Sequence, residues 1–145
     1  MGEKKIKKGY TCGVYDLFHV GHLNLFERCK EMCDYLIVGV CDDNYVREVK
    51  KKEPVINEND RTRIVKALKV VDEAHVINIE TTIDKMLALK KFDYNVLFVG
   101  DDWKGTPRFI ETEKQFKENG IDVEIVFLPY TKEVSTSKLR KELKK

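Results

Sequence analysis

Residues 11–22 of this chain read TCGVYDLFHVGH, and they decide its fold. The apolar pattern of residues 8–12 predicts a short strand, the glycine that follows predicts a turn, and the pattern from His22 onward predicts an amphipathic helix. The first amides of such a helix have no intrahelical partner, and the helix dipole favours an anion there. The segment therefore predicts a phosphate site at the first strand–helix junction.

Two of the three histidines in the chain, His19 and His22, flank Gly21 at this junction. An imidazole can donate hydrogen bonds to phosphoryl oxygens, and a glycine lets a ligand approach the backbone closely. The alternative interpretation is that the two histidines only close the turn. Their spacing beside a glycine turn favours a functional site.

Strand-like and helix-like patterns alternate along the rest of the chain. Alternation of this kind implies parallel crossovers, so we expect an α/β fold with a Rossmann-like, doubly wound parallel sheet of about five strands in three α/β/α layers. The expected strands are residues 8–12, 35–41, 75–79, 95–99 and 123–128. The expected helices lie near residues 22–32, 42–46, 57–68, 83–91 and 109–119, with a last helix after Ser137.

The order of these elements predicts where a ligand binds. In doubly wound sheets, ligands bind at the carboxyl ends of the strands, where the strand order reverses. The loops after the first, fourth and fifth expected strands should therefore meet at one edge. These loops contain residues 16–22, 101–103 and 131–137.

Length and composition limit the class of protein. A chain of 145 residues predicts a single domain, residues 1–145, with a substantial core. The near balance of 27 basic and 25 acidic residues gives no reason to expect nucleic-acid binding. The longest apolar run, residues 35–41, is too short to span a bilayer, and no signal segment opens the chain. We therefore expect a cytoplasmic protein with no membrane segment.

The four cysteines are the remaining candidates for a metal site. Cys29 and Cys33 share a helix face, but no second Cys/His pair with ligand spacing follows them. We therefore expect reduced thiols that act as small core side chains, and no metal site built by the protein.

The residues at the first junction resemble a known family. Residues 19–22 match the H-x-G-H signature of the nucleotidyltransferase superfamily, and residues 13–22 resemble its cytidylyltransferase branch. Glycerol-3-phosphate, phosphocholine and phosphoethanolamine cytidylyltransferases belong to that branch. The resemblance covers most of the chain. It implies that His19 and His22 contact the phosphates and the developing charge, without a covalent enzyme intermediate.

Two further motifs follow in the order that the family has them. Residues 134–137 (VSTS) resemble its I-S-T-T or I-S-T-S signature, whose hydroxyls and free amides suit the β- and γ-phosphates, although helix capping is an alternative. Residues 100–103 (GDDW) match the G-D-D-W run found in glycerol-3-phosphate cytidylyltransferases. A carboxylate there can accept from the amine of cytosine, and the indole can pack against a ligand. A simple Asx turn is the alternative.

The chain departs from the family pattern at one phosphate-binding position. Tyr130 stands where the cytidylyltransferases usually have an arginine. Lys132 or Arg140 can supply the missing charge. Arg140 also fits the form of the motif found in adenylyltransferase relatives, which leaves the choice of base open.

Basic residues in the middle of the chain match further family positions. Lys50 and Lys52 match its mobile loop, and Arg61 matches the arginine that opens its next helix, where a guanidinium can clamp a phosphate. A solvated surface run is the alternative for the lysines. Asp16 falls at the motif aspartate, and capping of its own loop is an equal alternative. Residues 70–73 (VVDE) resemble the family's dimer interface, which implies a homodimer.

These features predict an enzyme that transfers CMP from CTP to a small phosphorylated alcohol, giving a CDP-alcohol and pyrophosphate. Mg²⁺ is expected on the triphosphate, where it neutralises charge. Glycerol 3-phosphate, which would give CDP-glycerol, is the leading acceptor. Phosphocholine, phosphoethanolamine and an adenylyltransferase activity are alternatives, and a catalytically inactive nucleotide-binding regulator is the non-enzyme alternative.

The residues expected to form the site fall into three groups. The catalytic group is His19, His22, Lys52 and Arg61. The nucleotide-binding group is Thr11, Gly13, Val14, Tyr15, Asp16, Gly21, Gly100, Asp101, Asp102, Trp103, Thr131, Ser135, Thr136 and Ser137. Further phosphate contacts are expected from Lys50, Lys132 and Arg140.

Overall fold

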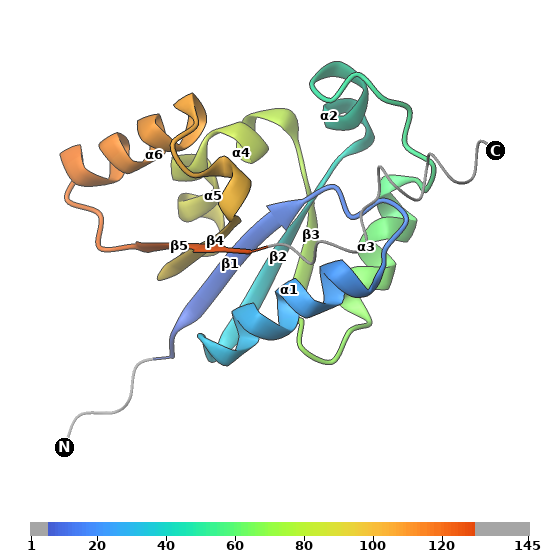
Figure 1. Ribbon diagram of the computed structural model, residues 1–145, viewed down its shortest axis with the longest axis horizontal. Coiled ribbons are helices and arrows are strands. Elements are labelled where there is room, and N and C mark those ends of the chain that lie inside the picture. Colours follow the sequence, from blue (N-terminus) through green and yellow to red (C-terminus); the bar gives the residue numbers. More distant parts are fainter. Residues whose placement is uncertain (1–5, 130–145) are drawn as a thin grey trace.

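The computed structural model describes residues 6–129, which form a five-stranded, fully parallel sheet with helices on both faces (Figure 1). This arrangement confirms the expected α/β, Rossmann-like fold. The strands are β1 (Lys8–Gly13), β2 (Tyr35–Cys41), β3 (Glu73–Ile77), β4 (Val96–Gly100) and β5 (Glu124–Leu128). The helices are α1 (Val20–Glu31), α2 (Asp43–Glu48), α3 (Glu58–Lys66), α4 (Ile79–Ile83), α5 (Lys85–Phe92) and α6 (Pro107–Glu118), with a 3₁₀ turn, η1 (Asp101–Trp103).

The order of the strands sets the position of the site. The sheet runs β3-β2-β1-β4-β5, so the chain moves outward from β1 to β3, returns to the other side of β1 at β4, and continues to β5. The order therefore reverses between β1 and β4. At such a point the two flanking loops diverge to opposite faces and leave a crevice at the carboxyl ends of the strands.

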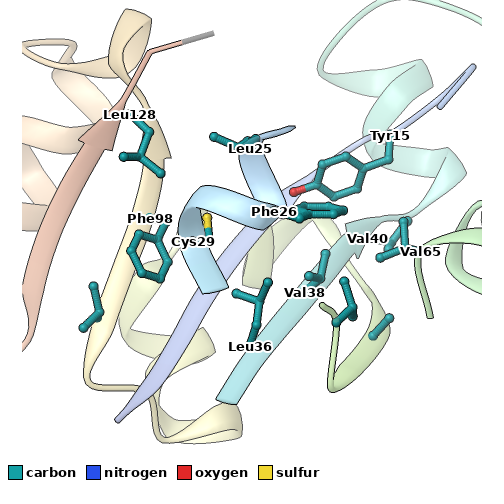
Figure 2. Close-up of a cluster of buried hydrophobic side chains, with 13 residues drawn as sticks. Tyr15, Leu25, Phe26, Cys29, Leu36, Val38, Val40, Val65, Phe98 and Leu128 are labelled. Carbon is teal, nitrogen blue, oxygen red and sulfur yellow. The ribbon is translucent and has the colours of Figure 1, made fainter. Parts of the chain in front are cut away.

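Two hydrophobic clusters, one on each face, hold the layers together. On the first face, Phe26 and Cys29 of α1 and Val65 of α3 pack with Val38 of β2 and Phe98 of β4 (Figure 2). On the second face, α5 and α6 pack against the sheet with a cluster that includes Tyr10, Phe92, Tyr94, Phe109 and Phe116. The ring of Tyr10 stacks on Phe92 and Tyr94 at centroid distances of 5.1 and 4.9 Å. The expected three α/β/α layers are therefore confirmed.

Side-chain caps begin the helices where the sequence predicted them. Asn57 accepts a hydrogen bond from the amide of Asp60 at 2.9 Å, and Asp42 accepts one from the amide of Tyr45 at 2.8 Å. Gly120 follows α6 with φ of +62°, a left-handed conformation that glycine adopts without strain. Local hydrogen bonding therefore fixes these boundaries.

The segment between β3 and α5 differs from the expectation. The expected strand to residue 79 ends at Ile77, because the Asn78 side chain accepts from the amide of Thr81 and caps the short helix α4. Asp84 then ends α4 and caps α5, with its side chain accepting from the amide of Met86 at 2.9 Å. At this break, Lys85 at the start of α5 contacts Cys12 of β1, and Thr82 of α4 contacts Cys41 at the end of β2.

The four cysteines have free thiols, as expected. Residues 6–129 contain no group of three or more His, Cys, Asp or Glu side chains that could hold a metal ion. None of the helices in this part of the chain has the length and apolar content that a bilayer crossing requires.

Candidate active site

The two histidines cap helix α1 through one nitrogen each. Nδ1 of His19 accepts a hydrogen bond from the amide of Gly21 at 3.0 Å, and Nδ1 of His22 accepts one from the amide of His19 at 3.2 Å. Their rings stack with centroids 4.0 Å apart. The histidines therefore close the turn, and because both Nδ1 atoms accept, the proton of each neutral ring lies on Nε2.

Both imidazoles are held in the neutral form. Burial lowers the pKa of His19, and burial together with the neighbouring His19 lowers the pKa of His22 to about 4. Each ring at neutral pH therefore offers an Nε2–H donor without carrying a charge. Nε2 of His19 is buried and has no hydrogen-bond partner within residues 6–129. A fixed, unused donor at a helix N-terminus suits an anionic oxygen.

A cavity of about 270 Å³ opens beside this helix start, at the carboxyl ends of β1 and β4. The loops after β1 and β4 meet there, as the order of the elements predicted. The expected site residues that line it are Thr11, Gly13, Val14, Tyr15, Asp16, His22, Lys50, Lys52, Gly100 and Trp103. The expected residues that lie in the described chain but do not line it are His19, Gly21, Arg61, Asp101 and Asp102. Of these, Asp101 and Asp102 are exposed on η1.

The remaining expected residues lie outside the described part of the chain. They are Thr131, Lys132, Ser135, Thr136, Ser137 and Arg140, and Tyr130 lies there too. The last described residue, Pro129, has a carbonyl that accepts a hydrogen bond from Nη1 of Arg28 at 3.1 Å. Because Arg28 belongs to α1, the chain after β5 leaves the described region against this helix.

Arg61 has a different role from the expected phosphate clamp. Its side chain is fully buried, and Nη1 donates to the carbonyls of Val14 and Cys41 at 2.7 and 2.8 Å. Nε donates to the carbonyl of Ile56 at 2.8 Å, and Nη2 pairs with the carboxylate of Asp43 at 2.6 Å. The guanidinium is therefore engaged within the chain. The expected phosphate clamp at Arg61 is therefore corrected. Arg61 instead joins the loop after β1, at Val14, to the end of β2, at Cys41.

Asp16 is a second positioning residue. Its carboxylate is buried, with Oδ2 accepting from the amide of Val55 at 2.8 Å and Oδ1 accepting from the amides of Ile56 and Leu17 at 2.9 and 3.1 Å. The bond from the amide of Leu17 confirms that Asp16 caps its own loop. The bonds from Val55 and Ile56 attach the segment between α2 and α3, residues 49–57, to the turn that precedes α1, and we call this segment the lysine loop.

The lysine loop lies over the cavity. Lys50 and Lys52 line it, and Nζ of Lys50 lies 5.3 Å from the ring centroid of Trp103. Lys51 between them has φ of +57°, and Arg47 pairs with Glu53 at 2.8 Å across the loop. The structure therefore brings both expected lysines to the site, while Lys51 turns the chain.

The sequence reasoning missed Lys85, which lies at the cavity. Its side chain is 3% exposed, and Nζ donates to the Thr82 carbonyl at 2.6 Å and to Cys12 Sγ at 3.2 Å. A signal was present, because Lys85, Ala88 and Phe92 have the spacing of one buried helix face. A lysine on such a face is unusual and indicates a special environment.

Arg108 was also missed, and it lines the cavity from α6. Its Nη1 donates to the hydroxyl of Tyr45 at 3.1 Å, and Cζ lies 4.7 Å from the ring centroid of Trp103. Tyr45 belongs to α2, far from Arg108 in the sequence, so no local pattern could have predicted this contact.

Comparison with known proteins gives relatives of two activities. A family model described as cytidylyltransferase-like matches residues 10–142. The chain is 35% identical to a glycerol-3-phosphate cytidylyltransferase of Bacillus spizizenii, over 95% of this chain and 98% of that protein. It is also 35% identical to an FAD synthase of Thermococcus kodakarensis, over 90% of this chain and 85% of that protein.

A solved structure has the same fold. A lipopolysaccharide core biosynthesis protein from Thermoplasma volcanium superposes on this chain with a TM-score of 0.74 at 28% identity. The match covers 90% of this chain and all of that one.

Proposed function

The chain belongs to the cytidylyltransferase-like family of nucleotidyltransferases, and from this premise we propose that it transfers CMP from CTP to a small phosphorylated alcohol. The observation that carries the proposal is the pair of neutral imidazoles at the start of α1. Their Nε2–H groups are fixed by the caps at Nδ1, beside a cavity that four cationic side chains line.

The reaction needs positioning and charge stabilisation more than covalent chemistry. An oxygen of the acceptor phosphate forms a bond to the α-phosphorus of CTP while the bond to the bridging oxygen breaks. The electron pair of that bond leaves with pyrophosphate. Negative charge grows on the phosphoryl oxygens as this happens, and the Nε2–H donors of His19 and His22 stabilise it.

Pyrophosphate departs on the side of α1 in this proposal. Both histidines offer Nε2–H donors there, while the amides of Gly21 and His22 are already bonded within the cap. The VSTS motif lies outside the described residues, and its hydroxyls suit the β- and γ-phosphates. Mg²⁺ enters with the triphosphate, since a polyanion of this charge needs a cation to neutralise it.

Glycerol 3-phosphate is the acceptor we propose, and the relative from Bacillus spizizenii supports it together with the GDDW run. Asp101 and Asp102 are exposed and do not line the cavity, so the choice of cytosine as the base rests on the family alone. A second candidate is adenylyl transfer to FMN, which the equal identity to an FAD synthase favours.

A release assay for pyrophosphate separates these candidates. CTP and ATP are each incubated with glycerol 3-phosphate, phosphocholine, phosphoethanolamine and FMN. We expect the highest kcat/KM for CTP with glycerol 3-phosphate. A higher value for ATP with FMN would replace the proposal by the second candidate, and binding of CTP without turnover would indicate a regulator.

A homodimer is proposed from the resemblance of residues 70–73 to the family interface. Much of this segment is engaged within its own chain, since Val71 is buried in the first cluster and Asp72 accepts from the amide of Leu36 at 2.8 Å. Val71 and Asp72 are therefore packed within their own chain and do not need a second subunit to bury them. Sedimentation at micromolar concentration tests the dimer, and a monomer with and without CTP would contradict it.

A further inference from the structure

Cys12 is a thiol that lies at the cavity beside a charged group. Its side chain is half-buried and lines the cavity, and Nζ of the buried Lys85 donates to its Sγ at 3.2 Å. No carboxylate within residues 6–129 forms an ion pair with Lys85, so the sulfur is the ionisable group that this ammonium contacts. The thiolate is the nucleophile in cysteine chemistry, and a neighbouring lysine stabilises it.

The Tyr10 hydroxyl is a second polar group near Cys12. It is fully buried and has no hydrogen-bond partner within residues 6–129. A methyl group on Gly39 would lie 2.6 Å from this hydroxyl and 3.3 Å from Cβ of Cys12, so the two side chains converge on one point of the sheet. A buried donor without an acceptor is unfavourable. A negative charge on the sulfur of Cys12 would place an acceptor near this donor.

The other three thiols have different surroundings. Cys29 and Cys41 are buried, and burial raises the pKa of both thiols. Burial also raises the pKa of Cys33, which packs against the first hydrophobic cluster and does not line the cavity. Of the four thiols, Cys12 therefore combines exposure to the cavity with a hydrogen bond from an ammonium group.

Cys41 also borders the cavity, but it lies too far from Cys12 to form a disulfide with it. Cys12 pairs with Gly39 in the parallel register, so Cys41 lies one strand away and two residues further along. The strand spacing and the rise per residue place the two Cα atoms roughly 8 Å apart, whereas a disulfide needs less than about 7 Å. A disulfide at Cys12 therefore joins it to an external molecule and not to Cys41.

The charge of the cavity favours an anionic reagent. The cationic side chains that line it are Lys50, Lys52, Lys85 and Arg108. The carboxylate of Asp16, which also lines it, accepts hydrogen bonds from three backbone amides. A cleft lined mainly by one sign of charge concentrates small ions of the opposite sign. Small disulfides with carboxylate groups, such as oxidised glutathione, are thiol-reactive molecules of that charge.

Resting on the proposed nucleotidyl transfer for its effect on activity, we propose that Cys12 is a site of reversible modification by small anionic disulfides and that the adduct blocks the cavity. The thiolate of Cys12, whose proton passes to solvent, attacks one sulfur of the disulfide. A new S–S bond forms at Sγ while the old one breaks, and the other sulfur leaves as a thiolate. A free thiol reverses the exchange. The cavity of about 270 Å³ is small beside ligand pockets of roughly 300–1,000 Å³, so it does not hold the adduct and a nucleotide together.

Mass spectrometry after treatment with oxidised glutathione tests the site without depending on turnover. We expect one glutathione per chain, bound at Cys12 and removed by dithiothreitol. Lys85→Met should slow formation of this adduct on the order of tenfold, as for loss of a hydrogen bond to a charged group, whereas Lys90→Met on the exposed face of the same helix should not. Faster modification of Cys33 than of Cys12, or equal rates in Lys85→Met and the wild type, would overturn the inference.

The charge of the reagent gives a comparison that needs no variant, and it serves if Lys85→Met does not fold. Cystamine is a small disulfide with two ammonium groups. When each rate is normalised to the rate with a free model thiol, Cys12 should react faster with oxidised glutathione than with cystamine. The opposite order would overturn the choice of an anionic disulfide.

Pyrophosphate release links the adduct to the site. We expect the wild type to lose activity in step with modification of Cys12 and to regain it with dithiothreitol. Cys12→Ser should keep its untreated rate under the same treatment, and Cys33→Ser, the matched control, should lose activity as the wild type does. The α,β-methylene analogue of CTP should slow modification of Cys12 but not of Cys33.

Two outcomes separate this inference from the proposed function. Full activity of a protein that carries the adduct at Cys12 would overturn the inference and leave the proposed function intact. An adduct at Cys12 that the CTP analogue slows, in a protein that releases no pyrophosphate, would overturn the proposed function alone.

Discussion

Arg61 and Lys85 are both buried cations near the carboxyl ends of β1 and β2, but their surroundings differ. Arg61 pairs with Asp43 and donates to three carbonyls, so the chain itself completes its bonding. Lys85 contacts one carbonyl and a thiol, its Nζ lies 5.6 Å from the ring centroid of Phe109, and the residue lines the cavity. The comparison teaches that burial of a charge does not by itself mark a functional residue. The difference between the two lies in the counter-charge: Asp43 supplies one to Arg61, and no carboxylate within residues 6–129 pairs with Lys85.

The largest expected effect is on stability, at Arg61. Arg61→Met leaves the Asp43 carboxylate and the carbonyls of Val14, Cys41 and Ile56 without the donor they have now, so we expect the free energy of unfolding to fall by about 3–5 kcal/mol. Urea denaturation measures it, with Lys85→Met as the matched variant, because that change removes a buried charge that has no counter-charge within residues 6–129 and should cost less than about 1 kcal/mol. Equal losses in the two variants would show that the two cations have the same structural role.

The next effect is on catalysis, at the histidines. Asparagine can replace Nδ1 as a helix cap but has no group at the position of Nε2, so His19→Asn and His22→Asn should fold normally. We expect each to lose on the order of a hundredfold or more in kcat, as when a transition-state donor is removed. Glutamine places an amide nitrogen near the position of Nε2, and His22→Gln should keep more activity than His22→Asn. Near-wild-type rates in both asparagine variants would leave the histidines as caps only.

A smaller effect is expected from pH. The pKa of His22 lies at about 4 in the folded chain, below the usual value of about 6.5, because the ring is buried beside His19. Between these values the unfolded chain binds more protons than the folded chain, so stability should rise with pH across this interval and level off above it. Urea denaturation from pH 4 to 8 checks this slope against His22→Asn, in which the contribution of His22 should disappear. An identical slope in that variant would place the titration elsewhere.

The smallest expected effect is at the lysine loop, where the side chains are mostly exposed. Lys52→Gln removes a cation that lines the cavity, and Lys51→Gln removes its neighbour, which does not. We expect Lys52→Gln to raise the KM for CTP several-fold at low salt and less at high salt, since salt screens exposed charges. The KM of Lys51→Gln should stay near that of the wild type. An equal rise in the KM for CTP in Lys52→Gln and Lys51→Gln would mean that the loop acts through its total charge.

The local features of the fold could be predicted from the sequence. The strand–turn–helix at residues 8–31 and the helix starts near residues 42 and 57 depend on neighbouring residues, and the structure has them where the pattern indicated, with caps at Asp42 and Asn57. The loops after β1 and β4 also meet as expected, because this follows from the order of the elements alone.

The bonding of the buried cations could not be predicted in the same way. The partners of Arg61 come from three segments, at Val14, at residues 41–43 and at Ile56, and only the folded chain brings them together. Lys85 depends on the break between α4 and α5, and the sequence analysis missed α4 because it assigned residues 78 and 79 to the preceding strand. Sequence reasoning assigned a phosphate to the arginine by motif and overlooked the lysine that has no counter-charge within residues 6–129.

The most direct test of the account follows the phosphorus atom itself. CTP labelled at its α-phosphate is incubated with glycerol 3-phosphate and Mg²⁺, and the label is followed for the wild type, His22→Asn and the control variant Lys51→Gln. The account predicts that the wild type moves the label into a CDP-alcohol with one pyrophosphate released per transfer. It predicts that His22→Asn does so far more slowly at saturating substrates and that Lys51→Gln does so at a rate near that of the wild type. Label that stays in CTP with the wild type, or transfer that His22→Asn leaves unchanged, would contradict it.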